Sequence, residues 1–255
     1  MFSTTEITSS EILSDNPIHQ RLFSAYAHAG EFVGGNLLEI GCGVGRGLSI
    51  LLEKSAQYTA IDKNEALIAD LTSKFPKGKF ISQNIPPLTN LPDNFFDFVV
   101  TFQVIEHIED DKLFLKEIHR VLKKGGKAII TTPNIKLSLT RNPWHTREYT
   151  ATELKNLVLE SFESVETRGI SGSEKVMTYH EQNRKAVAKY KKLDIFNLEK
   201  HLPRQILAIP YDILNRFNRK KLAQASGIAA EITDKDYLLG NEVENCLDFF
   251  YIATK

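Results

Sequence analysis

The sequence predicts an α/β protein built on a doubly wound, mostly parallel sheet with helices on both faces. Strand-like apolar runs alternate with helix-like periodic segments through most of residues 36–170, which is the pattern of consecutive βαβ units. The first strand stops at a turn with a glycine at every second position, over 41–47, and the second strand ends on an acid, Asp62. Both features are typical of the edge at which open α/β sheets bind ligands.

The individual elements follow from local patterns, taken in chain order. Asn16-Pro17 predicts the start of an amphipathic helix over 18–29, because proline is favoured in the first helical turn. Asn64 is expected to cap the helix after the second strand, and Thr150 or Thr152 the helix before the sixth. Strands are expected over 36–41, 58–62, 79–82, 96–102, 127–132, 162–170 and 246–254. Further helices are expected over 45–54, 65–74, 110–122 and 152–160.

The connection between the sixth and the last of these strands has no strand pattern and is too long for an ordinary loop. Apolar residues recur at helical spacing over 176–193 and again over 206–217. We therefore expect three parts. Residues 1–34 form an N-terminal helical cap, residues 35–172 with 240–255 form the ligand-binding domain, and residues 173–239 form a helical insertion that serves as a substrate lid.

The composition is that of an ordinary globular chain, with 32 basic and 32 acidic side chains in 255 residues. This balance gives no reason to expect DNA as a partner. Because there is no membrane-length apolar run and no signal-peptide pattern, the expected location is the cytoplasm and no membrane span is expected. The two cysteines, Cys42 and Cys246, form no metal-binding or disulfide pattern.

Basic residues are concentrated in the expected insertion, where residues 175–221 contain twelve Lys or Arg against four Asp or Glu. A solvated face is the ordinary interpretation of such a cluster. Two functional interpretations stay open beside it, recognition of an anionic acceptor and peripheral contact with acidic lipid.

The glycine turn does not match the dinucleotide fingerprint G-x-G-x-x-G. Residues 41, 43 and 46 are Gly, Gly and Arg, and residues 43, 45 and 48 are Gly, Gly and Leu. A turn without Cβ atoms still lets the backbone approach a small ligand, and the alternative is a tight turn with no ligand at all. Asp62 would emerge beside this turn, where a carboxylate can accept both hydroxyl hydrogens of a ribose; a plain strand-end acid or helix cap is the other interpretation.

Further blocks complete a pattern that resembles the class I S-adenosylmethionine (SAM) dependent methyltransferases. Residues 39–45 of the turn match the motif E-x-G-x-G-x-G. The motif F-D-x-V opens the fourth strand at 96–99, and the motif L-K-x-G-G precedes the fifth strand at 122–126. These blocks, with Asp62 and the loop 82–85, occur in order and cover roughly residues 36–170. The resemblance implies SAM as the cofactor and a sheet of seven strands, of which only the last is antiparallel.

The resemblance also implies which residues contact SAM. In that family an acid usually receives the adenine amino group in the third ligand loop, where this chain has Asn84, whose amide oxygen accepts the same bond without a charge. The expected cofactor-binding residues are Glu39, Gly41, Cys42, Gly43, Gly45, Asp62, Lys63, Asn84, Ile85, Phe102 and Gln103.

Two histidines are candidates for a catalytic base. His107 follows the fourth strand, where the methyl group of SAM would point, and His145 lies in a polar and aromatic loop over 142–149. A neutral imidazole suits proton abstraction from a hydroxyl near pH 7. Substrate positioning and a merely structural hydrogen bond are the alternatives for each. We therefore expect methyl transfer to a hydroxyl of a small molecule, a glycan or a lipid-linked intermediate, with N and C acceptors left open.

No metal site is expected for the favoured function, but one alternative function would need a bound metal ion. Glu106-His107 with His145 partly resembles the metal-binding block E-x-x-E-H of the small-RNA 2′-O-methyltransferases, in which the first acid corresponds to Gln103 here. RNA is accordingly an unlikely acceptor. The remaining alternatives are an NAD-dependent oxidoreductase and a nucleotide-binding module without catalysis.

Overall fold

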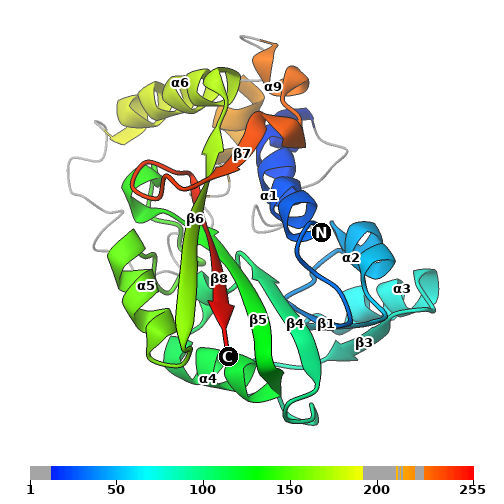
Figure 1. Cartoon of the computed structure of the whole chain (residues 1–255). Helices are drawn as coiled ribbons and strands as arrows, with labels where there is room; N and C mark the ends of the chain where they lie inside the picture. The colour runs from blue at the N-terminus through cyan, green and yellow to red at the C-terminus, as the bar shows by residue number, and fades with distance from the viewer. Residues whose placement is uncertain (1–12, 192–210, 212, 214, 222–226) are drawn as a thin grey trace.

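The computed structural model describes residues 13–191, 211, 213, 215–221 and 227–255. One mixed sheet runs through the molecule in the order β3-β2-β1-β4-β5-β8-β6-β7 (Figure 1). The first five strands in this order are parallel to one another, while β8 is antiparallel to both of its neighbours, so that β6 runs in the same direction as β1 to β5. The predicted fold class is confirmed.

The strand bounds lie close to the predicted ranges in most cases. The strands are β1 Asn36–Ile40, β2 Gln57–Asp62, β3 Lys79–Ser82, β4 Phe96–Phe102, β5 Leu122–Pro133, β6 Ser164–Gly172, β7 Tyr237–Gly240 and β8 Asp248–Thr254.

The α-helices described are α1 Asn16–Ala29, α2 Leu48–Lys54, α3 Glu65–Lys74, α4 Asp111–Val121, α5 Ala151–Leu159, α6 Glu174–Lys191 and α9 Ile228–Glu231. Short 3-10 helices are η1 Leu13–Asp15, η2 Ile105–His107, η3 Ile135–Leu137 and η4 Asp234–Asp236.

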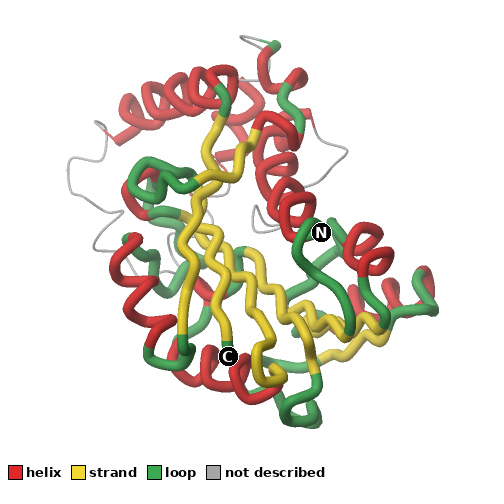
Figure 2. Tube along the Cα trace, viewed as in Figure 1, coloured by secondary structure: helices red, strands yellow, loops and turns green. Residues whose placement is uncertain are grey.

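Strand residues alternate between two hydrophobic cores, one on each face of the sheet. In β8, Phe249 and Tyr251 join the core that contains residues of α4 and α5, while Phe250 and Ile252 join the core that contains residues of α1, α2 and α3. This alternation is the consequence of the two-residue period of a strand. It gives three layers, with helices on both sides of the sheet (Figure 2).

The predicted count of seven strands is wrong, because the described residues form eight. The additional strand, β7, pairs antiparallel with residues 169–172 of β6. Three of its four residues lie within the stretch expected to be helical, 173–239. Only four residues long, with Tyr237 buried and Leu238 exposed, it is too short for its alternation to stand out in the sequence.

Helix caps explain where several helices begin. The Asn64 side chain accepts hydrogen bonds from the backbone of Ala66 and Leu67, as predicted, and Thr150 forms a capping box with Glu153. The helix expected from residue 45 instead starts at Leu48. Gly45 has a φ of 74°, which is incompatible with a right-handed helix.

Helix α1 lies between the sheet and the elements around β7. The Asn16 side chain donates to the carbonyls of Ala229 (2.7 Å) and Ile232 (2.9 Å), and the Tyr237 hydroxyl donates to the carbonyl of Pro17 at 2.6 Å. Helix α6 confirms the helical periodicity of the insertion as far as residue 191. Of the second predicted helical range, 206–217, the described residues 211, 213 and 215–217 are helical, while 206–210, 212 and 214 lie outside the described residues, as do 192 and 193 of the first range.

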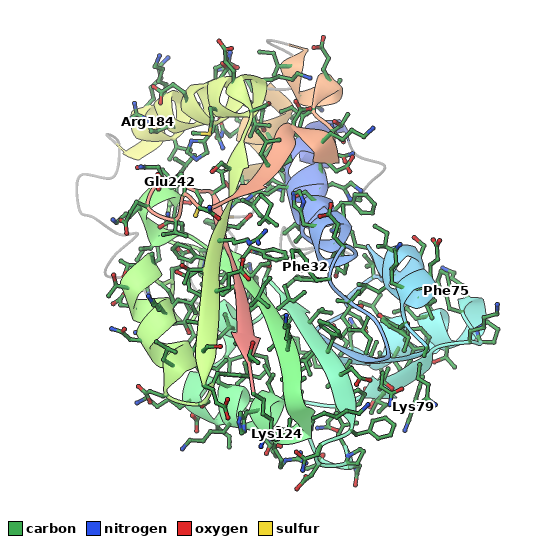
Figure 3. The ribbon with its side chains drawn as sticks, in the orientation of Figure 1. Phe32, Phe75, Lys79, Lys124, Arg184 and Glu242 are labelled. Atoms are coloured by element: carbon green, nitrogen blue, oxygen red, sulfur yellow. The ribbon has the colours of Figure 1, made fainter. Side chains whose placement is uncertain are left out.

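The carboxyl ends of β1, β4 and β5 face α1 and α6. Lys124, just after the start of β5, lies at the opposite end of the molecule from α6 and its Arg184 (Figure 3). Within the basic cluster, Arg184 and Lys185 both pair with Glu181 on the same helix. In the described part of the chain, no helix has the length and apolar character needed to cross a bilayer.

Candidate active site

The glycine turn lies at the end of β1, the point where the strand order reverses from β2 on one side to β4 on the other. Gly41, Gly43 and Gly45 have positive φ angles of 82°, 51° and 74°. A Cβ on Gly41 would lie 2.4 Å from the Val104 side chain, and one on Gly45 would lie 2.7 Å from Leu71. A Cβ on Gly43 would meet nothing within 4 Å, so this is the glycine whose surface is open.

Asp62 lies beside the open glycine. Its Oδ2 accepts a hydrogen bond from the backbone N–H of Gly43 at 2.9 Å, and its Oδ1 accepts one from the backbone N–H of Asn64 at 2.9 Å. Each carboxylate oxygen can accept a second hydrogen bond. The aspartate is therefore fixed in position by the backbone and retains acceptor capacity toward a ligand.

Glu39 is buried beneath the turn and is 1% exposed. Oε1 accepts a hydrogen bond from the Tyr26 hydroxyl at 2.8 Å, and Oε2 accepts one from the Tyr58 hydroxyl. Burial raises the pKa of Glu39, and the two tyrosine hydroxyls oppose that shift. The carboxylate thus joins α1, β1 and β2 below the turn.

The Tyr26 ring packs directly on the turn. A Cβ on Gly47 would lie 2.0 Å from Tyr26 Cγ, and the ring makes an edge contact with Phe102 at a centroid distance of 4.5 Å. Arg46 contacts the His19 ring, also on α1. The N-terminal helix therefore lies over the glycine turn, as its amphipathic pattern and position suggested.

The other predicted cofactor residues surround the same edge. Cys42 and Phe102 are buried, Lys63 and Asn84 are exposed, and Ile85 is half-buried. Gln103 directly follows β4 with a φ of 57°, and its side chain donates to Asp248 Oδ1 at 3.2 Å. Left-handed backbone at a residue other than glycine is uncommon and is typical of functional sites.

His107 lies in η2, directly after β4. Its Nδ1 is 2.9 Å from the carbonyl oxygen of Trp144, which can only accept, so Nδ1 carries the hydrogen and Nε2 holds the lone pair. Burial is the main cause that lowers the pKa of His107 to about 4, and nearby His145 and Lys63 lower it further. The ring is therefore neutral at physiological pH.

His145 packs against His107 with perpendicular rings and a centroid distance of 4.9 Å. Its Nδ1 is 2.7 Å from Glu148 Oε1 and its Nε2 is 2.7 Å from Asn142 Nδ2. With the Nδ1 hydrogen donated to the carboxylate, Nε2 accepts from the amide. Both ring nitrogens are then engaged, unlike those of His107.

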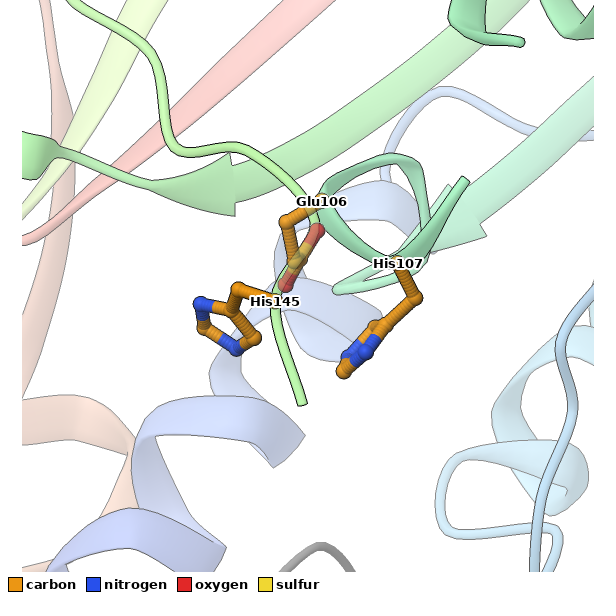
Figure 4. A group of neighbouring side chains, drawn as sticks. All are labelled: Glu106, His107 and His145. Carbon is orange, nitrogen blue, oxygen red and sulfur yellow. The ribbon is translucent and has the colours of Figure 1, made fainter. Parts of the chain in front are cut away.

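Glu106 completes the group and is 1% exposed (Figure 4). Oε2 accepts a hydrogen bond from the Thr132 hydroxyl at 2.9 Å, whereas Oε1 has no partner. Burial raises the pKa of Glu106 to about 7. The ligand-capable atoms of Glu106, His107 and His145 lie within 4.8 Å of one another, a set that could hold a metal ion.

A cavity of about 310 Å³ adjoins these residues. One wall consists of Gln103, Glu106, His107 and the loop that carries Trp144 and His145. Further lining residues come from α1, from α6 and from the described helical residues Tyr211, Asn215, Asn218 and Arg219. Through Gln103, the cavity reaches the carboxyl end of β4.

Several residues of this site have no motif in the sequence. Arg21 on α1 forms a two-pronged ion pair with Asp248, with Nε to Oδ2 at 2.6 Å and Nη2 to Oδ1 at 2.5 Å. Tyr26 and Tyr58 are similarly unmarked. The one available signal was Glu39 itself, because an acid in an apolar strand requires hydrogen-bond partners.

Comparison with known proteins agrees with this geometry. Residues 38–130, which span β1 to β5, match the family model described as a methyltransferase domain.

Curated relatives share part of the chain. A protein of Mycolicibacterium smegmatis named as a probable S-adenosylmethionine-dependent methyltransferase is 37% identical over 158 residues, which are 60% of each protein. A Mycobacterium tuberculosis protein of the same description is 39% identical over 131 residues, 49% of this chain and 47% of that protein. The chain therefore spans about half to three-fifths of the length of these relatives.

Solved structures share the fold at low sequence identity. A SAM-dependent methyltransferase from Thermotoga maritima is similar with a TM-score of 0.57 and 16% identity, over 93% of this chain and 91% of that one. The cyclase SpnF is similar with a TM-score of 0.55 and 18% identity, over 92% and 81%. With its glycine turn, its strand order and the methyltransferase domain matched over residues 38–130, the chain is similar to the class I SAM-dependent methyltransferases, and these comparisons support SAM as its cofactor.

Proposed function

We propose that the chain transfers the methyl group of SAM to a hydroxyl of an acceptor bound in the cavity beside His107. The observation that carries this proposal is the position of His107, which borders the cavity and lies close enough to Lys63, next to Asp62, for that charge to lower its pKa. The proposed cofactor site and the proposed acceptor site would meet at this residue. SAM supplies an activated sulfonium methyl when bound.

The glycine turn and Asp62 would hold the cofactor. Gly43 offers an open backbone surface, and Asp62 retains acceptor capacity for the two hydroxyls of a ribose. The other proposed contacts with the cofactor are Gly41, Gly45, Lys63, Asn84, Ile85, Phe102 and Gln103. Glu39 and Cys42 lie behind the turn and would support it from below, because both are buried.

His107 is the better placed of the two histidines to act as a base, because its Nε2 lone pair is uncommitted. A bound SAM would supply the methyl group and S-adenosylhomocysteine would be its product, while Nε2 of His107 would accept the proton that the acceptor hydroxyl loses. His145 would position the loop beside it, since Glu148 and Asn142 occupy both of its ring nitrogens. In-line positioning and exclusion of water supply much of the acceleration.

The insertion would act as a lid on the acceptor. Residues of α6 line the cavity together with Tyr211, Asn215, Asn218 and Arg219, and α1 adds Pro17 and Arg21. A small-molecule, glycan or lipid-linked acceptor fits such a partly enclosed site, and we expect neither DNA nor RNA to enter it.

The direct test is formation of S-adenosylhomocysteine from SAM in the presence of candidate acceptors. His107→Gln should lower kcat by about 10²–10⁴-fold with little change in cofactor affinity, as expected for loss of a general base. An equal rate in the variant and the native protein would exclude His107 as the base.

A second candidate function uses a divalent metal at Glu106, His107 and His145. The donor set fits in part. Glu106 Oε1 is unpaired, and the Trp144 carbonyl holds Nδ1 of His107, which leaves Nε2 of that ring for an ion. Nε2 of His145 would have to exchange its contact with Asn142 for the metal. An ion there would polarise the acceptor hydroxyl, as required of an RNA 2′-O-methyltransferase. Two nitrogens and one carboxylate oxygen suit several divalent metals.

Chelation separates the two candidates. If methyl transfer continues in EDTA and RNA is not methylated, the metal-dependent function is excluded. If activity on RNA is lost in EDTA and restored by added Mg²⁺, Mn²⁺ or Co²⁺, the base-catalysed proposal is wrong.

A further inference from the structure

The cavity beside His107 contains most of the unsatisfied buried polar atoms. Among the described residues, four buried side-chain N or O atoms have no hydrogen-bond partner. Three of them, Glu106 Oε1, Trp144 Nε1 and Asn215 Nδ2, belong to residues that line this cavity. Since a buried donor or acceptor without a partner destabilises the folded state, their concentration at one place indicates a site that a ligand completes.

A pair of amides adds further hydrogen-bonding capacity to the cavity wall. Asn218, 4% exposed, donates its Nδ2 hydrogen to Asn183 Oδ1 at 2.7 Å. The two amides line the cavity together with the unpaired donors Trp144 Nε1 and Asn215 Nδ2 and the unpaired acceptor Glu106 Oε1. The wall therefore offers both donors and acceptors, and a hydroxyl is the ligand group that uses both.

The charges around the cavity are already neutralised in the described part of the chain. Arg21 is paired with Asp248, and Arg219 is 3.2 Å from Asp15. Among the described lining residues, these are the arginines, and no lysine is present. His107 is neutral, as derived above. A phosphate or carboxylate would therefore find no uncompensated cation on this wall.

We infer that the acceptor is an uncharged molecule carrying several hydroxyls, namely a saccharide unit. This inference rests on the proposed methyl transfer and narrows its acceptor. Trp144, Tyr179 and Tyr211 line the cavity and provide flat apolar faces for the C–H face of a sugar ring, while the polar atoms above pair with its hydroxyls. The volume of about 310 Å³ is at the small end of ligand sites, which suits a small sugar rather than a long chain.

Binding can be tested without catalysis. Saturation-transfer NMR on the full chain would compare three uncharged methyl hexosides (gluco, manno and galacto) with the corresponding hexose 6-phosphates and with catechol. Binding of at least one methyl hexoside, stronger than its phosphate and than catechol, is expected. Preference for the phosphates or for catechol, or no binding of any methyl hexoside at 10 mM, would overturn the inference.

Matched variants test the residues. Trp144→Phe keeps the ring and removes the Nε1 hydrogen, and Asn215→Leu removes the amide; each should weaken hexoside binding by about tenfold. Thr101→Val is the control, because Thr101 Oγ1 is the fourth unpaired atom and does not line the cavity. Equal weakening by all three variants, or by none, contradicts the assignment. Hexoside binding with no cofactor binding would instead refute the proposed methyl transfer alone.

Discussion

The Tyr26 hydroxyl on α1 donates a hydrogen bond of 2.8 Å to Oε1 of Glu39 on β1, beneath the glycine turn. The same tyrosine ring covers Gly47. The N-terminal helix and the first strand are thereby coupled at the proposed cofactor site, so changes in one should be detected in the other.

Tyr26→Phe removes one of the two hydroxyl partners of a fully buried carboxylate. We expect the free energy of unfolding to fall by about 1–3 kcal/mol, because the acceptor then has no partner. Denaturant unfolding measures this change. In the Glu39→Gln background, Tyr26→Phe should lower the free energy of unfolding by less, because a neutral amide without a partner is less unfavourable than a carboxylate without one. An equal loss in both backgrounds would mean that the two side chains act independently.

Gly47→Ala and Gly43→Ala should separate packing from ligand approach. An added Cβ at Gly47 collides with Tyr26, so unfolding should occur at lower denaturant. At Gly43 the Cβ has free space, and with a φ of 51° alanine should cost only about 1–2 kcal/mol of backbone strain. Calorimetric titration should show that the Gly43 variant loses more cofactor affinity than its loss of stability explains. If the variant keeps its full affinity, Gly43 does not contact the cofactor.

Asp62→Ala should weaken cofactor binding by about 1.5–3 kcal/mol if the carboxylate holds the ribose through charged hydrogen bonds. Asp62→Asn should retain part of the affinity, since one oxygen acceptor remains. Titration with S-adenosylhomocysteine measures both variants. No change in either would place the ribose elsewhere.

Glu106 predicts a pH dependence of stability with a definite sign. Its pKa is raised by burial to about 7 in the folded protein, from 4.5. The folded state therefore binds the Glu106 proton more tightly than the unfolded state does. The resulting contribution to the free energy of unfolding is fully present below pH 4.5 and is lost as the pH rises through 7. At pH 8, Glu106→Gln should be more stable than the native protein by roughly 2–4 kcal/mol, with no gain at pH 4.

The exposed Glu163→Gln variant is the control and should show no such difference between pH 4 and pH 8. Thermal or denaturant unfolding at the two pH values decides the matter. A Glu106→Gln variant that is less stable than the native protein at pH 8 would mean that the carboxylate is compensated by a partner.

The sequence was sufficient for those features that depend on local pattern. The Asn64 cap and the strand that ends on Asp62 both follow from side-chain chemistry within a few residues. β7 could not be predicted, since four residues give too little alternation and its pairing with β6 depends on tertiary structure. Helix α2 begins later than predicted because the backbone of Gly45 is left-handed, and the apolar pattern of a helix carries no information on backbone angles.

The site was predicted in part, for a similar reason. His107 and His145 were expected to flank one position, and the structure brings their rings within 4.9 Å. Their hydrogen-bond partners, and the pairing of Arg21 with Asp248 across 227 positions of sequence, depend on how α1 and the loops pack. Long-range contacts of this kind have no local signal.

The central claim is that the turn at Gly43 and Asp62 binds SAM. The most direct measurement is calorimetric titration of the full chain with S-adenosylhomocysteine and, separately, with NADH. Saturable binding of S-adenosylhomocysteine that is weakened in Asp62→Ala, with no binding of NADH, is the predicted result. Binding of NADH without binding of S-adenosylhomocysteine would contradict it.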